Sequence, residues 1–319
     1  MSSPLFISWK RYQRRSDVLA EALGAEVAWR PSKATPKFLR PFDYLTHTSN
    51  DLKLLRSLRP PFVVAQAQPH LSALAPYLGR VPYIVDAHNG QFQSWWRKVP
   101  STASILRKAQ LVLTHTQEAD AIAQATFPGL RTLVVHDPLR EIPPAAPRGW
   151  VFVVATVAPD EPMDVLIDAI EAMPDVNFAT TAPLHRLPPP LRERAERLRN
   201  FTTLGFLDLP DYEAAVAAAR AVVVLTDRDA TQPSGACEAL SAGRPLVLSR
   251  TRTTEALFGN FATLVANERD SLVAGVRTAI EEDPTAAGRI AAARQAWMSR
   301  TATELETLRA HVPAGAARR

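Results

Sequence analysis

One stretch decides the fold class of this chain: Ala221-Val-Val-Val-Leu-Thr-Asp-Arg-Asp-Ala-Thr-Gln-Pro-Ser-Gly-Ala-Cys-Glu-Ala-Leu-Ser-Ala-Gly-Arg-Pro-Leu-Val-Leu-Ser249. A β-branched apolar run ends at Thr226, a polar loop follows, and Ser234-Gly235 opens a helix of small residues that stops at Gly243-Arg244-Pro245. Leu246-Val247-Leu248 then predicts the next strand. A strand–helix–strand step of this kind is typical of a parallel sheet, and its helix begins beyond the carboxyl end of a strand.

The start of this helix is a candidate phosphate site. The first N–H groups of a helix have no partner within the helix, and the helix dipole favours negative charge there. We therefore expect Ser234, Gly235 and Ala236 to lie against a phosphate group. Glu238 follows one turn later, where its carboxylate can accept hydrogen bonds from a ribose diol. Arg228, in the preceding loop, is the nearest candidate cation.

Strand-like runs alternate with helical patterns along the whole chain, which predicts parallel sheets with helices on both faces. The predicted strands are 5–8, 26–29, 62–66, 82–86, 111–115, 132–136, 150–156, 176–180, 202–205, 221–226, 246–249 and 263–265. We expect an α/β protein of two doubly wound, Rossmann-like domains that face a cleft. A proline-marked segment, with Pro138, Pro143, Pro144 and Pro147, is the expected linker, so the predicted domains are residues 1–146 and 147–319.

The composition, 46% hydrophobic and 22% charged, is that of a globular protein. The sequence contains no stretch that resembles a membrane span or a secretory signal. The single cysteine excludes an internal disulfide framework. We therefore expect a cytoplasmic protein.

Lys and Arg outnumber Asp and Glu by 19 to 10 in residues 1–149, but are outnumbered by 18 to 22 in residues 150–319. The basic first half predicts either an anionic acceptor, with peripheral binding to the inner membrane face, or a solvated basic surface. No nucleic-acid motif is present.

Metal chemistry is not indicated. Asp227-Arg228-Asp229 has the Asp-x-Asp form that can hold Mg²⁺ or Mn²⁺, but a match of three residues is common by chance. The sequence contains no zinc-ligand spacing and no Walker A motif. We therefore expect neither a metal nor another cofactor.

The segment Glu238-Ala-Leu-Ser-Ala-Gly-Arg-Pro245 resembles the donor-site motif of retaining GT-B glycosyltransferases, the glycogen-synthase-like and family 4 enzymes. In those enzymes a first glutamate precedes the second with seven residues between them, and these seven residues include a Gly-aromatic-Gly turn. Here Ala230 occupies that position, and Asp229 is the neighbouring carboxylate. The resembled enzymes also carry an Arg and a Lys-Gly after the first strand of the second domain, and this chain has neither in Val157–Pro162.

The resemblance implies roles for residues that follow other strands. His88, in Asp86-Ala-His-Asn89, would face the reacting sugar, and Asp229 would be the second catalytic residue. Thr156 and Thr180 would line the donor crevice, and Gly205-Phe206 would meet the nucleotide base. The last helix, about residues 285–309, would cross back to the first domain.

The expected function is therefore transfer of a sugar from a UDP-, GDP- or dTDP-sugar to a hydroxyl acceptor. By resemblance, the transfer would retain configuration and need no metal, and it would serve surface polysaccharide, glycolipid or natural-product glycosylation. Two other interpretations remain open: a sugar-nucleotide epimerase, and an inactive GT-B module that binds a partner glycosyltransferase. The oligomeric state is not predicted.

Overall fold

The computed structural model describes residues 3–10, 13–31, 40–67, 70–87, 89–281 and 285–312, and contains two six-stranded parallel sheets. The chain divides into two compact units. Unit 1 consists of Met1–Asp137 and Arg300–Arg319, and unit 2 consists of Pro138–Ser299. The predicted α/β class with two parallel-sheet domains is confirmed.

Unit 1 contains a sheet in the order β2-β1-β3-β4-β5-β6, with every neighbouring pair parallel. Its strands are β1 (Leu5–Ser8), β2 (Glu26–Trp29), β3 (Val63–Ala67), β4 (Tyr83–Ala87), β5 (Leu111–Thr114) and β6 (Thr132–Val134). Its helices are α1 (Arg14–Leu23), α2 (Arg40–Leu58), η2 (His70–Ala73), α3 (Leu74–Gly79), α4 (Asn89–Gln93), η3 (Trp95–Lys98), α5 (Ser101–Lys108) and α6 (Gln117–Thr126).

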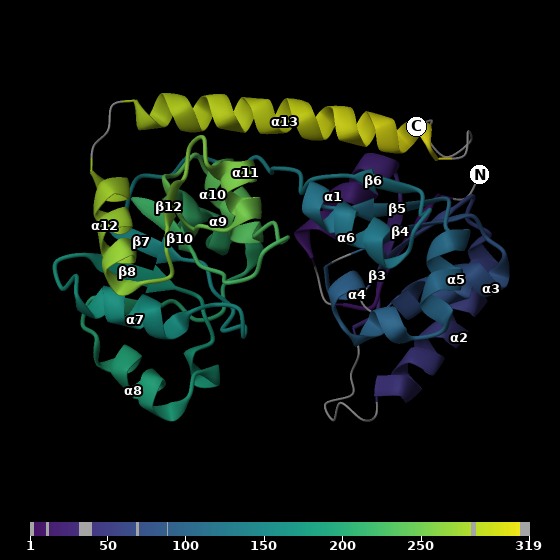
Figure 1. The fold of residues 1–319 in the computed structure, drawn as a ribbon, viewed down its shortest axis with the longest axis horizontal. Coiled ribbons are helices and arrows are strands. Elements are labelled where there is room, and N and C mark those ends of the chain that lie inside the picture. Colours follow the sequence, from purple (N-terminus) through teal and green to yellow (C-terminus); the bar gives the residue numbers. More distant parts are fainter. Residues whose placement is uncertain are drawn as a thin grey trace. The chain divides into compact units, whose positions relative to one another are not determined.

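Alternate residues of the central strands of this sheet enter two separate apolar clusters, as the two-residue repeat of a strand requires. Ile7 and Val85 pack in a cluster with α2, α5 and α6, whereas Phe6 and Ile84 pack in a cluster with α1 and the end of α13 (Ala286–Ala310). These helices are labelled in Figure 1. Both faces of the sheet are covered. This explains why β3 is apolar along most of its length and does not alternate with polar residues.

Unit 2 contains a sheet in the order β12-β11-β10-β7-β8-β9, again parallel throughout. Its strands are β7 (Trp150–Val153), β8 (Asn177–Thr180), β9 (Phe201–Thr203), β10 (Ala221–Val224), β11 (Leu246–Ser249) and β12 (Thr263–Val265). Its helices are α7 (Met163–Glu171), η4 (Leu184–Arg186), α8 (Pro189–Arg197), α9 (Leu209–Ala217), α10 (Ser234–Ser241), α11 (Arg252–Phe258), α12 (Arg269–Ile280) and the first part of α13 (Ala286–Ala310).

The second sheet is also covered on both faces. Val151 and Val223 enter a cluster with α7, α8 and α12, whereas Phe152 and Val222 enter a cluster with α9, α10 and α11 (Figure 1). Each side chain in these layers is almost fully buried, and burial of a side chain of this size stabilises a fold by about 1.5–3 kcal/mol. The sheet is therefore a rigid base for the loops that follow its strands.

Residues 138–148 are fixed to unit 2 by hydrogen bonds. The Arg140 N–H donates to Ser241 Oγ at 3.3 Å, and the Ala145 carbonyl accepts from Arg244 Nη2 at 2.8 Å. The two units divide at Asp137–Pro138, whereas the sequence predicts the division at residues 146–147, inside this segment.

Helix α13 contributes to the cores of both units. In unit 2 the ring of Trp297 stacks on Phe258, with centroids 5.1 Å apart. In unit 1 Leu308 is fully buried, and Glu304 accepts hydrogen bonds from His136, whose backbone N–H lies 2.8 Å from Oε2. The units divide this helix between Ser299 and Arg300.

Among the described helices, none combines the length and the apolar character needed to cross a bilayer. Within the same described ranges, no three His, Cys, Asp or Glu side chains are grouped so that they could hold a metal ion.

Candidate functional site

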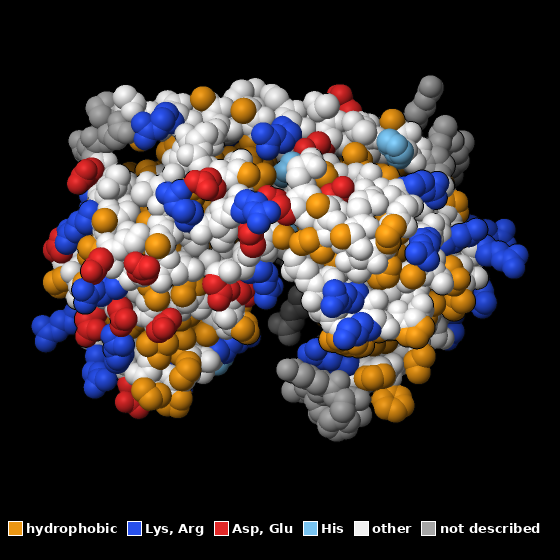
Figure 2. Space-filling model, in the orientation of Figure 1, with side chains coloured by type: hydrophobic (Ala, Val, Ile, Leu, Met, Phe, Trp, Pro, Cys, Tyr) orange, Lys and Arg blue, Asp and Glu red, His pale blue; other side chains and the backbone are white. Residues whose placement is uncertain are grey.

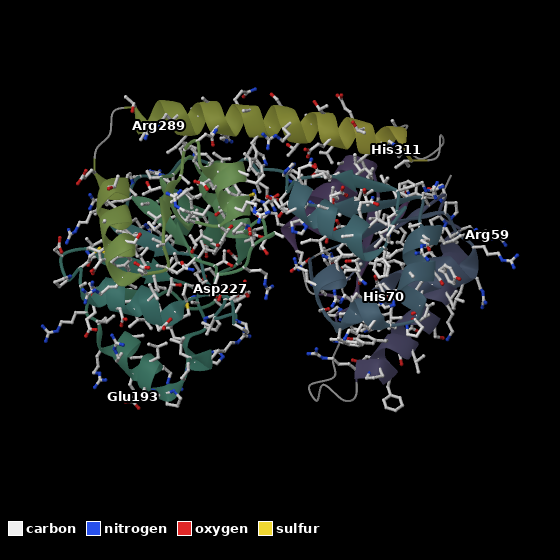
Figure 3. All side chains as sticks on the ribbon, in the orientation of Figure 1. Arg59, His70, Glu193, Asp227, Arg289 and His311 are labelled. Carbon is white, nitrogen blue, oxygen red and sulfur yellow. The ribbon has the colours of Figure 1, made fainter. Side chains whose placement is uncertain are left out.

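The order of the strands in unit 2 marks a crevice. From β7 the chain moves outward to β8 and β9, and it then returns to the other side of β7 to form β10. The carboxyl ends of β7 and β10 are therefore the topological switch point, where open α/β sheets bind ligands. The loops at residues 154–162 and 225–233 follow these two strands, and Asp227, labelled in Figure 3, lies in the second loop.

Helix α10 begins at this switch point because its second residue is glycine. A Cβ on Gly235 would lie 2.8 Å from Cγ1 of Val154 and 3.0 Å from Cγ2 of Val224, so no larger residue fits between the helix and the two strands. Ser234 is exposed, and the Ala236 N–H donates to the Pro233 carbonyl at 3.1 Å. The structure thus places Ser234, Gly235 and Ala236 in the first turn of α10, beside the ends of β7 and β10.

Glu238 lies on the next turn of α10 and is held by a tyrosine. The Tyr212 hydroxyl, from α9, donates to Glu238 Oε2 at 2.6 Å. The Tyr212 ring packs edge-on against Phe152, with centroids 5.8 Å apart. The carboxylate is half-buried and has a defined orientation, as a group that recognises a diol requires.

Arg228 is joined to the loop after β7. Its Nη2 lies 3.4 Å from Asp160 Oδ1, and Thr226 Oγ1 donates to Asp160 Oδ2 at 3.2 Å. The Asp227 N–H also donates to the Asp160 carbonyl, at 2.8 Å. The two switch-point loops therefore form one network, and the charge of the half-exposed Arg228 is partly balanced by Asp160.

Asp229 binds the start of helix α11. Its Oδ1 accepts from the Ala230 N–H at 3.1 Å, from the Thr253 N–H at 3.1 Å and from Thr253 Oγ1 at 3.0 Å. Burial raises the pKa of Asp229, but the hydrogen bonds from Thr253 and Ala230 and the nearby Arg252 outweigh it and hold the pKa below its usual value. Ala230 has φ 54°, in the left-handed region. Three donors on one oxygen indicate that Asp229 shapes the loop.

The other residues predicted to bind the nucleotide-sugar donor lie at the same edge of the sheet, where its strands end. Thr180 is buried, and its Oγ1 donates to the Val153 carbonyl at 2.9 Å, so it ties β8 to β7. Gly205 has φ 71°, and the following Phe206 is 98% exposed. Thr156 is exposed after β7, and its hydroxyl donates to Glu161 Oε1 at 3.0 Å.

Three further residues, Tyr212, Glu161 and Arg186, lie at this edge or contact its residues, but the sequence does not predict them as part of the site. Arg186, which follows β8, reaches the Thr156 carbonyl with its Nη1 at 3.5 Å. Ser249 was also not identified: it accepts from the Thr226 N–H at 2.9 Å and donates to Asn267 Oδ1 at 2.6 Å. A polar residue at the end of an apolar strand is the signal that could have found Ser249.

Unit 1 has its own polar edge, at the switch point between β1 and β3. Ser8 Oγ donates to Gln66 Oε1, and Gln66 Nε2 donates to Gln13 Oε1. Lys10 follows β1, and burial lowers the pKa of its ammonium group although Asp86 opposes the shift. These groups were not singled out from the sequence.

Asp86 pairs with a buried arginine. Arg15 Nε lies 2.9 Å from Asp86 Oδ1, and its Nη1 lies 2.8 Å from Asp137 Oδ1. Burial lowers the pKa of Arg15, but the two carboxylates outweigh it and raise the pKa. The pairing joins the ends of β4 and β6 to α1.

His88, the predicted catalytic histidine that follows β4, lies outside the described residues.

No family model matches the sequence, and no curated protein matches it. Solved structures are similar in fold over nearly the whole chain. HepE from Anabaena in complex with UDP-glucose has a TM-score of 0.74 at 17% identity, over 97% of this chain and 100% of that one. Sucrose-phosphate synthase from Thermosynechococcus elongatus has a TM-score of 0.70 at 15% identity, over 97% and 100% of the two chains.

A glycosyltransferase from Rickettsia africae has a TM-score of 0.69 at 11% identity, over 97% of both chains. These neighbours consist of two Rossmann-like domains, which matches the two parallel sheets described above. The chain therefore has the GT-B fold.

Proposed function

We propose that this protein is a glycosyltransferase that moves a sugar from a nucleotide-sugar donor to a hydroxyl acceptor. The observation that carries the proposal is the position of α10, whose first turn meets the ends of β7 and β10 through the close contact of Gly235 with Val154. The similar HepE structure contains UDP-glucose, which supports a nucleotide sugar as the donor class.

In this proposal unit 2 binds the donor. The N–H groups of Ser234 and Gly235 would bind the diphosphate, and Glu238 would accept hydrogen bonds from the ribose hydroxyls. Phe206 would stack on the base with its exposed ring. Arg228 would stabilise the negative charge that develops on the leaving diphosphate. Transfer with retention and without a metal remains part of the proposal, because positioning and charge stabilisation are the chemistry that these side chains can supply.

Unit 1 would bind the acceptor, and we propose that the acceptor is anionic and held at a membrane surface. Phe42 and Leu45 on α2 are 66% and 67% exposed, and Trp95 on η3 is 62% exposed. Lys53 and Arg56 continue the exposed stripe of α2 at helical spacing. In the face shown in Figure 2, unit 1 displays several Lys and Arg side chains and few acidic ones, whereas unit 2 displays both signs. Apolar and basic groups together suit an anionic bilayer.

The donor assignment is tested by a thermal-shift panel of UDP, GDP, dTDP and ADP and their common sugars, with and without Mg²⁺. A ligand that binds the folded state raises the melting temperature by mass action. We expect a metal-independent shift from one nucleotide, which disappears in Glu238→Ala. The absence of any shift would contradict the donor assignment. Product analysis with the bound sugar then separates transfer from epimerisation, and binding without turnover would indicate an inactive module.

The acceptor assignment is tested by flotation with phosphatidylglycerol and phosphatidylcholine vesicles. We expect binding to the anionic vesicles alone, and loss of that binding in a Phe42→Ser, Leu45→Ser double variant. Equal flotation of the parent and the double variant would contradict the proposed surface.

A further inference from the structure

The loop after β7 contains a carboxylate with an unusually complete set of donors. Glu161 Oε2 accepts from the Thr156 N–H at 2.9 Å and from the Ala158 N–H at 2.9 Å. Glu161 Oε1 accepts from the Thr156 hydroxyl at 3.0 Å and from the Thr156 N–H at 3.1 Å. Val157, between the two N–H donors, has φ 58°. Successive N–H groups that converge through a left-handed residue form a concave anion site, called a nest.

This nest lies where a phosphate is expected. The loop follows β7, one of the two strands of the switch point, and Val154 at its start contacts Gly235 in the first turn of α10. Thr156 is exposed, so a solute can reach the donors. A β-branched residue in the left-handed region is strained by about 1–3 kcal/mol, and such strain is concentrated at functional sites.

The side chain of Arg186 supplies a positive charge beside the nest. Arg186 Nη1 lies 3.5 Å from the Thr156 carbonyl, which brings the guanidinium to this loop from the end of β8. Within the described ranges no carboxylate forms an ion pair with Arg186, whereas Arg228 is paired with Asp160. The loop thus offers two N–H groups, one hydroxyl and one arginine to an anion, and the chain's own carboxylate occupies the N–H groups and the hydroxyl.

We propose that the nest formed by Thr156, Val157 and Ala158 is a phosphate-binding subsite, and that Glu161 is an internal anion which the phosphate of the ligand displaces. The inference rests on the proposed binding of a nucleoside diphosphate in unit 2. A carboxylate and a phosphate present similarly spaced oxygens to the same donors, so one replaces the other without a new loop conformation. Because both are negative, Glu161 weakens binding of the diphosphate until it moves away. Glu161 therefore sets the affinity of this site.

The test is calorimetric titration of the full chain with inorganic pyrophosphate and with UDP, in the parent and in Glu161→Gln. The glutamine amide oxygen keeps an acceptor for the loop but removes the charge. We expect about tenfold tighter binding in Glu161→Gln, which corresponds to about 1.4 kcal/mol. Glu161→Ala, which empties the nest, is expected to bind at least as tightly as Glu161→Gln. Melting temperatures of both variants report whether the fold is kept.

The matched control is Glu193→Gln, which removes the same charge from unit 2. Glu193 is exposed on α8 and is well separated from Asp227 in Figure 3. This variant is expected to bind like the parent. Binding by the parent that is not strengthened in either Glu161 variant overturns the inference but leaves the proposed function standing. Failure of the parent and both variants to bind either probe overturns both.

Discussion

The hydroxyl of Tyr212 donates a 2.6 Å hydrogen bond to Oε2 of Glu238 and so joins helix α9 to helix α10. We predict that Tyr212→Phe weakens nucleotide binding by about three- to tenfold, because the carboxylate loses the partner that orients it. Glu238→Ala is expected to weaken binding more. The two effects are expected not to add in the double variant, since the residues act as one unit. Calorimetric titration measures all three, and unchanged affinity in Tyr212→Phe would count against an orienting role.

Asp229 was predicted to be catalytic, and its contacts now define an experiment that separates two roles. Asp229→Ala removes the acceptor of three hydrogen bonds, so we expect the free energy of unfolding to fall by about 1–3 kcal/mol. Asp229→Asn keeps an acceptor oxygen and is expected to recover part of that stability. If Asp229 only shapes the loop, the folded Asp229→Asn variant is expected to turn over substrate at nearly the rate of the parent. A stable Asn variant without turnover would instead identify a catalytic carboxylate.

Phe206 is 98% exposed, so its replacement removes no buried packing. We predict that Phe206→Ala leaves the melting temperature unchanged and weakens nucleotide binding by at least fivefold, because base–aromatic stacking contributes about 1–3 kcal/mol. Phe42→Ala, on α2 of unit 1, is a matched control that removes another exposed phenyl ring and is expected to leave nucleotide affinity unchanged. Equal affinity in the parent and Phe206→Ala would exclude the stacking role.

Gly235 is required by packing. A methyl group there would approach Val154 Cγ1 to 2.8 Å, and we predict that Gly235→Ala lowers the free energy of unfolding by about 1–3 kcal/mol. Adding Val154→Ala is expected to restore part of the loss, since it removes the nearest atoms. Denaturant titration of the single and double variants measures the coupling, and a fully additive result would contradict the contact.

Stability in unit 1 is predicted to depend on the protonation of His70. The side chain is buried against Ser101 and Thr102, and burial lowers its pKa to about 4. Between about pH 4 and 6.5, the usual pKa of a histidine, the unfolded chain binds a proton that the folded chain does not bind. The stability is therefore complete above pH 6.5 and falls by on the order of 1–3 kcal/mol as the pH approaches 4.

Denaturant titrations at pH 4.5 and pH 7.5 measure this loss, and His70→Gln is the control that cannot titrate. The difference in unfolding free energy between the two pH values is expected to be smaller in the variant. An identical pH dependence in both proteins would rule out His70 as the cause.

The strands were predictable because apolar β-branched runs have few other interpretations. Leu5–Ser8, Leu246–Ser249 and Thr263–Val265 were predicted with the bounds that the structure shows. The start of helix α2, at Arg40, is hard to predict, since its first turns carry the exposed Phe42 and Leu45 and lack an inward apolar repeat. Helix α11 is likewise hard to predict from the sequence, because its seven residues offer too few turns for a clear helical period.

The candidate site was predictable where function depends on backbone position and not where it depends on side-chain partners. The small residues at Ser234 and Gly235 indicated a close-packed helix start. Nothing in the sequence indicated that Val157 takes a left-handed conformation, which is what lets Glu161 turn back on Thr156. The bond between Tyr212 and Glu238 depends on how α9 packs on α10, and no local pattern reports such packing.

The burial of Leu308 in unit 1, beside Phe6 and Leu19, has a consequence for synthesis on the ribosome. Domains usually fold in the order in which they emerge, but the apolar cluster of unit 1 stays open until its last residues have been translated. Unit 2 is contiguous in sequence and can complete its sheet first. At ordinary elongation rates the nascent N-terminal unit waits roughly 10–30 s for its final helix turns, with apolar surface available to chaperones in the meantime.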